Sequence, residues 1–270
     1  MSAGEGPGEI AHEDAPAGWR ALRAQGTACL AAVQFLTMAP PVIRRAFSPA
    51  ELGGAVGYFP AVGLLVGLVL AGLDAALGAL LPAGLAAAGL LAAWVLLTGA
   101  LHLDGFLDSC DGLLGGHTPE RRLEIMRDHR VGAYALAGGV LLLLIEWSAL
   151  GALAGRRLPL LLAPVLGRWA MSLAIVAHPY ARPQGLGRLL KDNARAPQLA
   201  LATVLAVVAA GLLGGWRGLA ALGLAALATW AGARWILRRI PGLTGDSYGA
   251  LCVLVEASVL VLSVAFEGGH

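Results

Sequence analysis

Long stretches without a charged residue constrain this chain more than any other feature. Asp, Glu, Lys and Arg are absent from residues 52–73, 75–103, 131–145, 196–216 and 218–233. A helix of roughly 20 apolar residues spans the hydrocarbon core of a bilayer, and several of these stretches reach or approach that length. Only 13% of the residues are charged, whereas a soluble domain carries about 25%. The sequence therefore predicts an integral membrane protein rather than a soluble core of buried helices.

The apolar pattern predicts an all-α, polytopic membrane helix bundle with about seven transmembrane helices. We place them at residues 53–80, 84–102, 131–154, 158–179, 197–215, 218–237 and 249–266. Residues 19–40 are apolar over a shorter length and end at two prolines, which predicts a re-entrant or interfacial N-terminal segment. Residues 1–18 are acidic and rich in Gly and Pro, and we interpret them as a disordered tail. Residues 19–270 are expected to form a single membrane-embedded domain.

Two local patterns refine this picture. Ser48 and Glu51 flank Pro49 in a capping-box pattern, so a helix is expected to begin there. Small residues at GxxxG spacing favour close contact between membrane helices. The chain has this spacing at Gly53/Gly57 and at Gly63/Gly67.

The distribution of basic residues predicts the orientation in the membrane. With seven spans, 14 of the 19 Lys and Arg residues lie on one side, three on the other and two within spans. Because basic residues favour the cytoplasmic side, the loops 103–130, 180–196 and 238–248 are expected to face the cytoplasm, with the C-terminus outside. The net charge of +2 gives no sign of nucleic-acid binding, and the three cysteines have no zinc spacing.

Three aspartates form the densest acidic pattern. Asp104, Asp108 and Asp111 are spaced i, i+4 and i+7, which places them within one narrow arc if the second span continues as a helix. Crowded carboxylates repel one another unless a cation neutralises them, and an oxygen-only ligand set is typical of Mg²⁺ or Mn²⁺. A metal site is therefore predicted. The alternative is a solvated helix end at the membrane surface.

A basic segment follows the acids. Thr118 and Pro119 predict the start of another helix. Four arginines follow, namely Arg121, Arg122, Arg127 and Arg130. Arginines opposite a metal and its carboxylates are suited to hold a diphosphate. Pairing of these arginines with Glu124 and Asp128 on a cytoplasmic helix explains them equally well.

Further charges lie near helix ends or inside predicted spans. Arg182 and Asp246 each lie close to glycines at a cytoplasmic helix end, where a phosphate or sugar can approach the backbone. Arg168 and Glu146 fall inside spans. A charge in such a place is costly and usually functional or paired, so Arg168 is expected to bind phosphate or to lie near Glu146. Glu256 carries less weight because it could lie near a helix end.

Several motifs occur together in an order that resembles the cobalamin synthase (adenosylcobinamide-GDP ribazoletransferase) family. They cover about residues 28–266, and the long block at 102–132 is the specific one. The block contains His102-Leu103-Asp104-Gly105, Asp108, Asp111-Gly112, Glu124-Ile125-Met126-Arg127-Asp128 and Arg130-Val131-Gly132. Shorter matches are Phe35-Leu36-Thr37, Phe59-Pro60, Gly167-Arg168, Tyr180-Ala181-Arg182 and Thr244-Gly245-Asp246. The chain departs from the pattern at Glu146 and Val253.

The resemblance implies a transferase that joins adenosylcobinamide-GDP to α-ribazole or its 5′-phosphate and releases GMP, at the end of cobalamin biosynthesis. It also implies a Mg²⁺ requirement and a multi-pass location in a bacterial inner membrane, in contact with lipid. Mg²⁺ would be held by Asp104, Asp108 and Asp111. The remaining site residues are Arg121, Arg168, Arg182 and Asp246 for substrate binding, and Asp128, Arg127 and Arg130 for catalysis. Asp128 or one of the three aspartates is the candidate general base.

Two other functions stay open. The spacing of Asp108, Asp111 and Gly112 also resembles the opening of the CDP-alcohol phosphotransferase motif, but the Ala-Arg that should follow is absent. A cation-coupled transporter could use the three aspartates as an ion site. Transporters, however, place such groups near the middle of the membrane, often in repeated halves, and this chain shows no internal repeat.

Overall fold

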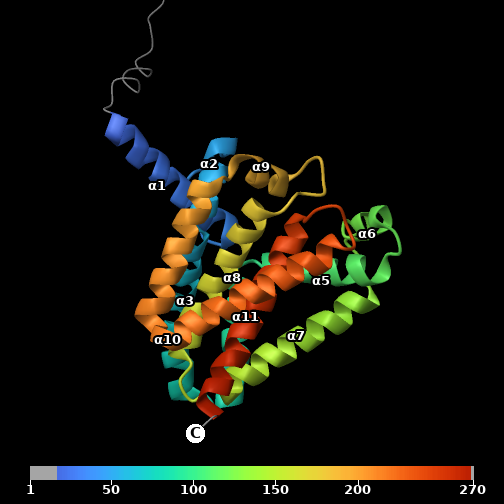
Figure 1. Ribbon diagram of the computed structural model, residues 1–270. Coiled ribbons are helices and arrows are strands. Elements are labelled where there is room, and N and C mark those ends of the chain that lie inside the picture. The colour runs from blue at the N-terminus through green and yellow to red at the C-terminus, as the bar shows by residue number, and fades with distance from the viewer. Residues whose placement is uncertain (1–16, 269–270) are drawn as a thin grey trace, which may run out of the picture.

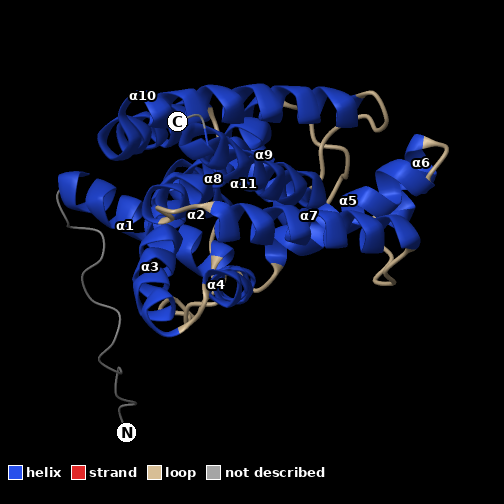
Figure 2. Ribbon diagram, turned by 90° about the horizontal axis from the view of Figure 1, so that it is seen from below, coloured by secondary structure: helices blue, strands red, loops and turns tan. Residues whose placement is uncertain are grey.

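Most of the described chain, residues 17–268 of a computed structural model, is α-helical (Figure 1 and Figure 2). The helices are α1 (Ala17–Leu36), α2 (Pro49–Ala55), η1 (Val56–Tyr58), α3 (Phe59–Leu80), α4 (Ala83–Leu97), α5 (Leu101–Gly115), α6 (Pro119–Ile125), α7 (Ala133–Ala152), α8 (Arg157–Ala177), α9 (Leu186–Asn193), α10 (Ala196–Leu237) and α11 (Gly245–Gly268). The predicted all-α fold is confirmed. Of the predicted tail, residues 1–16 lie outside the described residues, and residues 17 and 18 begin α1.

Five helical segments are long and apolar enough to cross a membrane. They are Pro49–Leu80, Ala133–Ala152, Arg157–Ala177, Ala196–Leu237 and Gly245–Gly268, and the pair α4 and α5 would make a sixth. The polytopic membrane architecture is thus confirmed, whereas the count of seven stays a prediction. The difference arises at α10, which covers two of the predicted spans. Helix α1 is not among the candidate spans, as expected for an interfacial or re-entrant segment.

Helix α10 bends at Gly215, which has non-helical backbone angles (φ 54°, ψ −135°), and its two halves diverge from this bend in Figure 1. Exposed tryptophans mark both ends of the second half: Trp216 lies at the bend, and Trp235 lies near the end. At 1.5 Å per residue they are roughly 28 Å apart along the helix, close to the thickness of the hydrocarbon core. Tryptophans at such positions are typical of membrane–water interfaces.

Helix α8 is the centre of the bundle, because α3, α10 and α11 all pack against it. A side chain at Gly63 or Gly67 of α3 would collide with the backbone of α8 at Pro164 or Leu160. The prediction that these glycines permit close helix contact is therefore confirmed. So is the capping box, since Ser48 and Glu51 exchange both of its hydrogen bonds.

The second predicted span does not continue into the acidic segment. Helix α4 ends at Leu97, and α5 turns away from it by 89°. The turn runs through Gly99 and Ala100, both left-handed (φ 59° and 57°), and the hydroxyl of Thr98 donates to the carbonyls of the last turn of α4. Asp104 therefore lies on a separate helix that crosses the direction of α4. The expectation of one continuous helix is wrong.

Helix α5 lies directly on the N-terminal part of α11. A Cβ on Gly105 would come within 2.8 Å of the Asp246 carbonyl oxygen, and one on Gly249 within 3.1 Å of the His102 carbonyl oxygen. A side chain at Gly105 would therefore force the two helices apart, and one at Gly249 would be tightly crowded. The contact brings the acidic face of α5 close to the first turn of α11.

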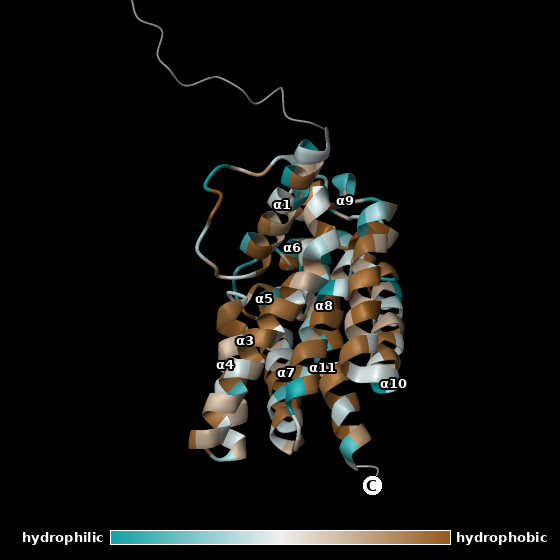
Figure 3. Cartoon of the chain, turned by 90° about the vertical axis from the view of Figure 1, so that its left-hand side faces the viewer, coloured by the Kyte–Doolittle hydropathy of each residue, from teal (hydrophilic) through white to brown (hydrophobic). Residues whose placement is uncertain are grey.

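The polar loops gather at one end of the bundle. Figure 3 shows α1, α6 and α9 at this end, opposite the C-terminus. Arg122 donates to the carbonyl of Arg239 (3.0 Å), and Arg182 to that of Met126 (3.3 Å). The loops 103–130, 180–196 and 238–248 therefore share one side, as predicted. That this side is cytoplasmic stays a prediction.

Topology can be tested by replacing His117 with Cys in a cysteine-free variant. His117 is exposed between α5 and α6, on the side that carries most of the basic residues. We expect a membrane-impermeant thiol reagent added to intact cells to label it only after permeabilisation. The matched control is Ala154→Cys, exposed between α7 and α8 at the opposite end, which should be labelled in intact cells. The reverse pattern would show that the orientation is inverted.

Candidate active site

Two loops at the polar end are joined by a short β-bridge. The backbone of Leu243 donates to the carbonyl of Pro179 and accepts from the amide of Ala181, both at 2.8 Å. The bridge joins the loop that follows α8 to the loop that precedes α11. Arg182, one residue beyond the bridge, is thereby held against the first turn of α11.

Arg182 and Asp246 form an ion pair there. Their side chains are 2.7 Å apart and mostly buried, and Thr244 contributes a longer hydrogen bond of 3.3 Å to the same carboxylate. Both residues were predicted to bind substrate from their positions beside glycines. The structure brings them together.

The acids of α5 lie beside this ion pair. Asp104 and Asp246 line one cavity of ≈ 180 Å³. Asp108 is one turn further along α5 and half-buried, and the charges of Asp246, Asp104, Asp111 and Arg182 all act on it. The rest of the cavity wall is largely apolar and comes from α1, α5, α8, α9 and α11. The acids and Arg182 therefore lie beside a largely apolar cavity wall.

Asp111 has a different role from the other two acids. Its carboxylate accepts hydrogen bonds from the backbone amides of Gly132 (2.6 Å) and Ala135 (2.8 Å). These are the N-cap and third residues of α7. Asp111 therefore caps a neighbouring helix, where a negative charge is favourable, and it is buried while Asp104 is exposed.

The donor set fits a hard divalent cation in chemistry and charge. The ligands here are only carboxylate oxygens, which Mg²⁺ prefers, and they belong to Asp104, Asp108 and Asp246. The single positive charge of the neighbouring Arg182 does not balance their three negative charges. Within residues 17–268, however, no three His, Cys, Asp or Glu side chains are gathered closely enough to form a ready-made metal site. Cation binding would require these side chains to move together.

The predicted basic residues divide between the site and the surface. Arg121 pairs with Glu124 (2.7 Å) and lies on the outside of α6. Arg130 pairs with Asp128 (2.6 Å), and this hydrogen-bonded arginine lowers the pKa of Asp128 to about 2. Arg127 is exposed, and its charge acts on Tyr180 in the bridged loop.

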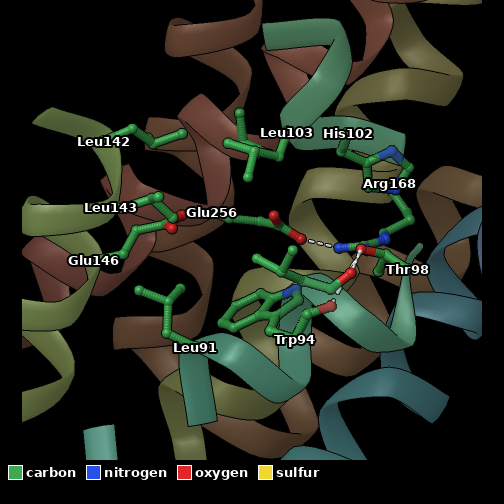
Figure 4. Close-up of a pocket in the computed structure, with 12 residues that line it drawn as sticks. Leu91, Trp94, Thr98, His102, Leu103, Leu142, Leu143, Glu146, Arg168 and Glu256 are labelled. Carbon is green, nitrogen blue, oxygen red and sulfur yellow. Dashed lines mark hydrogen bonds and ion pairs between the residues drawn. The ribbon is translucent and has the colours of Figure 1, made fainter. Parts of the chain in front are cut away.

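Arg168 lies apart from this site, inside the bundle. It is fully buried and ion-paired with Glu256 of α11, as Figure 4 shows. Glu146 lines the same small cavity, so the two are neighbours as expected, but Glu146 is not the pairing partner. The lower weight given to Glu256 was wrong, because the charge lies in the middle of α11 rather than near its end.

Two tyrosines belong to the site but were not predicted. The rings of Tyr180 and Tyr248 lie 6.0 Å apart, and Tyr248 lines the cavity. Burial raises the pKa of Tyr180, so its hydroxyl remains protonated at neutral pH. The position of Tyr180 two residues before Arg182 was the available signal. Tyr248 offered none, since an aromatic residue in an apolar helix is ordinary.

The chain is similar to one family over most of its length. The family described as cobalamin-5-phosphate synthase matches residues 28–264. Among curated proteins, the adenosylcobinamide-GDP ribazoletransferase of Stutzerimonas stutzeri is 46% identical over 240 residues, covering 86% of this chain and 95% of the relative. Proteins of the same name are 41% identical in Desulforamulus reducens (86% and 93% covered) and 40% identical in Roseiflexus sp. (85% and 86% covered). No solved structure matches.

The capping role of Asp111 gives a prediction that separates it from Asp104. Asp111→Ala leaves two amides of α7 without their acceptor, at a cost of about 1 kcal/mol or more, so the unfolding temperature of the purified protein should fall by a few degrees. Asp104→Ala, the matched control on the exposed side of α5, should leave it nearly unchanged. Equal shifts in thermal unfolding experiments would contradict the cap.

Proposed function

The chain belongs to the cobalamin-5-phosphate synthase family, and from that premise we propose that it is a membrane-embedded adenosylcobinamide-GDP ribazoletransferase. A ribose hydroxyl of α-ribazole, or of its 5′-phosphate, attacks the phosphorus that carries cobinamide. The bond from that phosphorus to the GMP oxygen breaks, GMP leaves with the electron pair, and the hydroxyl proton passes to a base. The enzyme is thus a phosphotransferase that moves a substituted phosphate group.

One observation carries the assignment to a site. Carboxylates from α5 and α11 meet Arg182 beside an apolar cavity, at the polar end of the bundle. Phosphoryl transfer depends mainly on positioning and on stabilising negative charge, so it needs cationic groups around the diphosphate rather than a covalent nucleophile. The apolar wall suits a substrate with a large organic group.

We propose that Asp104, Asp108 and Asp246 hold a Mg²⁺ ion. This ligand set keeps two of the three predicted aspartates. Asp246 replaces Asp111, whose carboxylate is hydrogen-bonded to the backbone of α7. The ion would neutralise charge on the diphosphate and on the departing GMP. The chain's own part is to present oxygen ligands from two packed helices at the cavity wall.

Arginines complete the electrostatic side of the site. Arg182 lies against Asp246, and Arg127 lies near the same loop, so both are placed to form forked hydrogen bonds with phosphate oxygens. Arg121 and Arg130 are tied to acids on the outer surface, and their proposed roles require these exposed pairs to open. Asp128 is a weak base while Arg130 holds its pKa at about 2.

A location in the bacterial inner membrane with the site facing the cytoplasm follows from the same proposal. The site lies at the end that carries most of the basic residues, which favours the cytoplasmic side. Lipid contacts the exposed apolar faces of the helices. Soluble guanylylated substrate would then reach the site directly from the cytoplasm.

Replacing the acids with amides tests the site. Asp104→Asn, Asp108→Asn and Asp246→Asn keep the side-chain shape but remove a negative ligand, and GMP release should fall on the order of 100-fold or more. Asp192→Asn is the matched control, because this acid pairs with Arg188 on the exposed side of α9. Rates are compared at equal amounts of protein in the membrane. Wild-type rates in all three variants would refute the site.

Removal of metal tests the cofactor. Purified protein treated with EDTA should release no GMP from adenosylcobinamide-GDP and α-ribazole, and Mg²⁺ should restore the reaction. The Asn variants should need more Mg²⁺ for half-maximal rate than the wild type, because each has lost one anionic ligand. Full activity in excess EDTA would rule out the metal while leaving the transferase assignment intact.

A further inference from the structure

A second, smaller cavity of ≈ 30 Å³ lies among the helices of the bundle. Its polar lining comes from five segments of the chain: Trp94 of α4, His102 of α5, Glu146 of α7, Arg168 of α8 and Glu256 of α11. Each of these side chains is at least nine-tenths buried. Figure 4 shows Glu146 and Arg168 on opposite sides of the Glu256 carboxylate.

Several polar atoms around this cavity lack protein partners. Within the described residues, nine buried side-chain nitrogen or oxygen atoms have no hydrogen bond, and five of them belong to Trp94, His102 and Arg168. Glu146 forms no hydrogen bond or ion pair with any described residue, because the charge of Arg168 is directed to Glu256. Buried polar groups rarely remain unsatisfied, and ordered water is the usual remedy.

The polar groups that line the cavity determine what can bind in it. A metal cation is disfavoured by the guanidinium of Arg168 and the indole N–H of Trp94, and an anion by Glu146 and Glu256. Water can donate to the carboxylates and accept from the N–H groups. A volume of ≈ 30 Å³ has room for about two water molecules, since one needs roughly 10–15 Å³ on the same measure.

His102 connects this cavity to the active site. It is the one described residue that lines both cavities. Its backbone lies on Gly249 of α11, and Asp104 follows two residues later on α5. Whatever fixes the imidazole of His102 therefore also fixes the helix that carries Asp104.

We propose that this smaller cavity binds one or two water molecules, which hydrogen-bond His102 to Glu146 and to the Arg168–Glu256 ion pair. His102 is then a positioning residue that holds α5 against α11. The water site is inferred from the buried polar atoms and does not depend on the proposed function, whereas the positioning role of His102 rests on it. Arg168 belongs to this interior network and supports the site from within the bundle.

A structure of the purified protein at a resolution that shows ordered water tests the binding site directly. We expect one or two water molecules within hydrogen-bonding distance of a ring nitrogen of His102 and of the Glu146 carboxylate. A direct hydrogen bond from Glu146 to a protein donor, with the cavity closed, would overturn the proposal. So would a Glu146 side chain turned toward lipid.

Variants test the positioning role. His102→Leu fills the space without hydrogen bonds, and we expect a loss of turnover on the order of 10- to 100-fold together with a higher Mg²⁺ requirement. His102→Gln, which can bond to water, should recover most of both. Leu114→Gln is the matched control, since it adds the same side chain on the exposed face of α5. Equal effects of Leu and Gln at position 102 would refute the role.

Glu146→Leu provides an independent test of the water network if His102→Leu does not fold. It removes the opposite wall of the water site, and it should raise the Mg²⁺ requirement in the same way. A wild-type Mg²⁺ response in folded Glu146→Leu protein would contradict the network. Should the wild-type protein release no GMP, the proposed function fails, but the structure and a lower thermal stability of His102→Leu than of His102→Gln still decide the water site.

Discussion

The ion pair between Arg168 and Glu256 is the interaction on which the arrangement of the bundle depends. Arg168 lies on α8, the helix against which α3, α10 and α11 pack, and it is fully buried. An isolated charge in such a place is very costly, and removing one partner of a buried pair typically costs about 3–5 kcal/mol. The pair therefore fixes the rotation and the height of α11 against α8. Since Asp246 lies in the first turn of α11, the interior charge also sets where one wall of the candidate site stands.

The second constraint is the close approach of α5 to α11. Gly105 and Gly249 allow the two backbones to meet, and the left-handed turn at Gly99 and Ala100 directs α5 across α4 to reach that contact. A helix that crosses the direction of a membrane span can expose acids to water along one face while its apolar face rests on the bundle. Asp104 thus avoids the cost of placing a charge within the hydrocarbon core.

Apolar stretches with few or no charges predicted the long helices α3, α4, α7, α8, α10 and α11, because the membrane requires long apolar segments whose backbone bonds are satisfied internally. The elbow before α5 could not be predicted, since Ala100 has no local preference for the left-handed conformation it adopts. In the site, the spacing of the acids identified the correct helix but not their different partners. The helical spacing groups Asp111 with Asp104 and Asp108, yet the backbone amide that Asp111 binds, that of Gly132, is 21 residues away in sequence. Likewise Arg168 was recognisable as a buried charge, but only packing selects Glu256 over Glu146.

The division of labour among the acids follows from these contacts. The Asp111 carboxylate accepts two backbone amides, so it cannot turn toward a cation without uncapping α7. In the described part of the chain, Asp104 and Asp108 cap no neighbouring helix. Asp246 forms an ion pair with Arg182, which lies on a loop rather than in a helix. In the proposed transferase, a substrate diphosphate that binds Arg182 would free the Asp246 carboxylate for the proposed cation, because phosphate offers the arginine an equally strong partner.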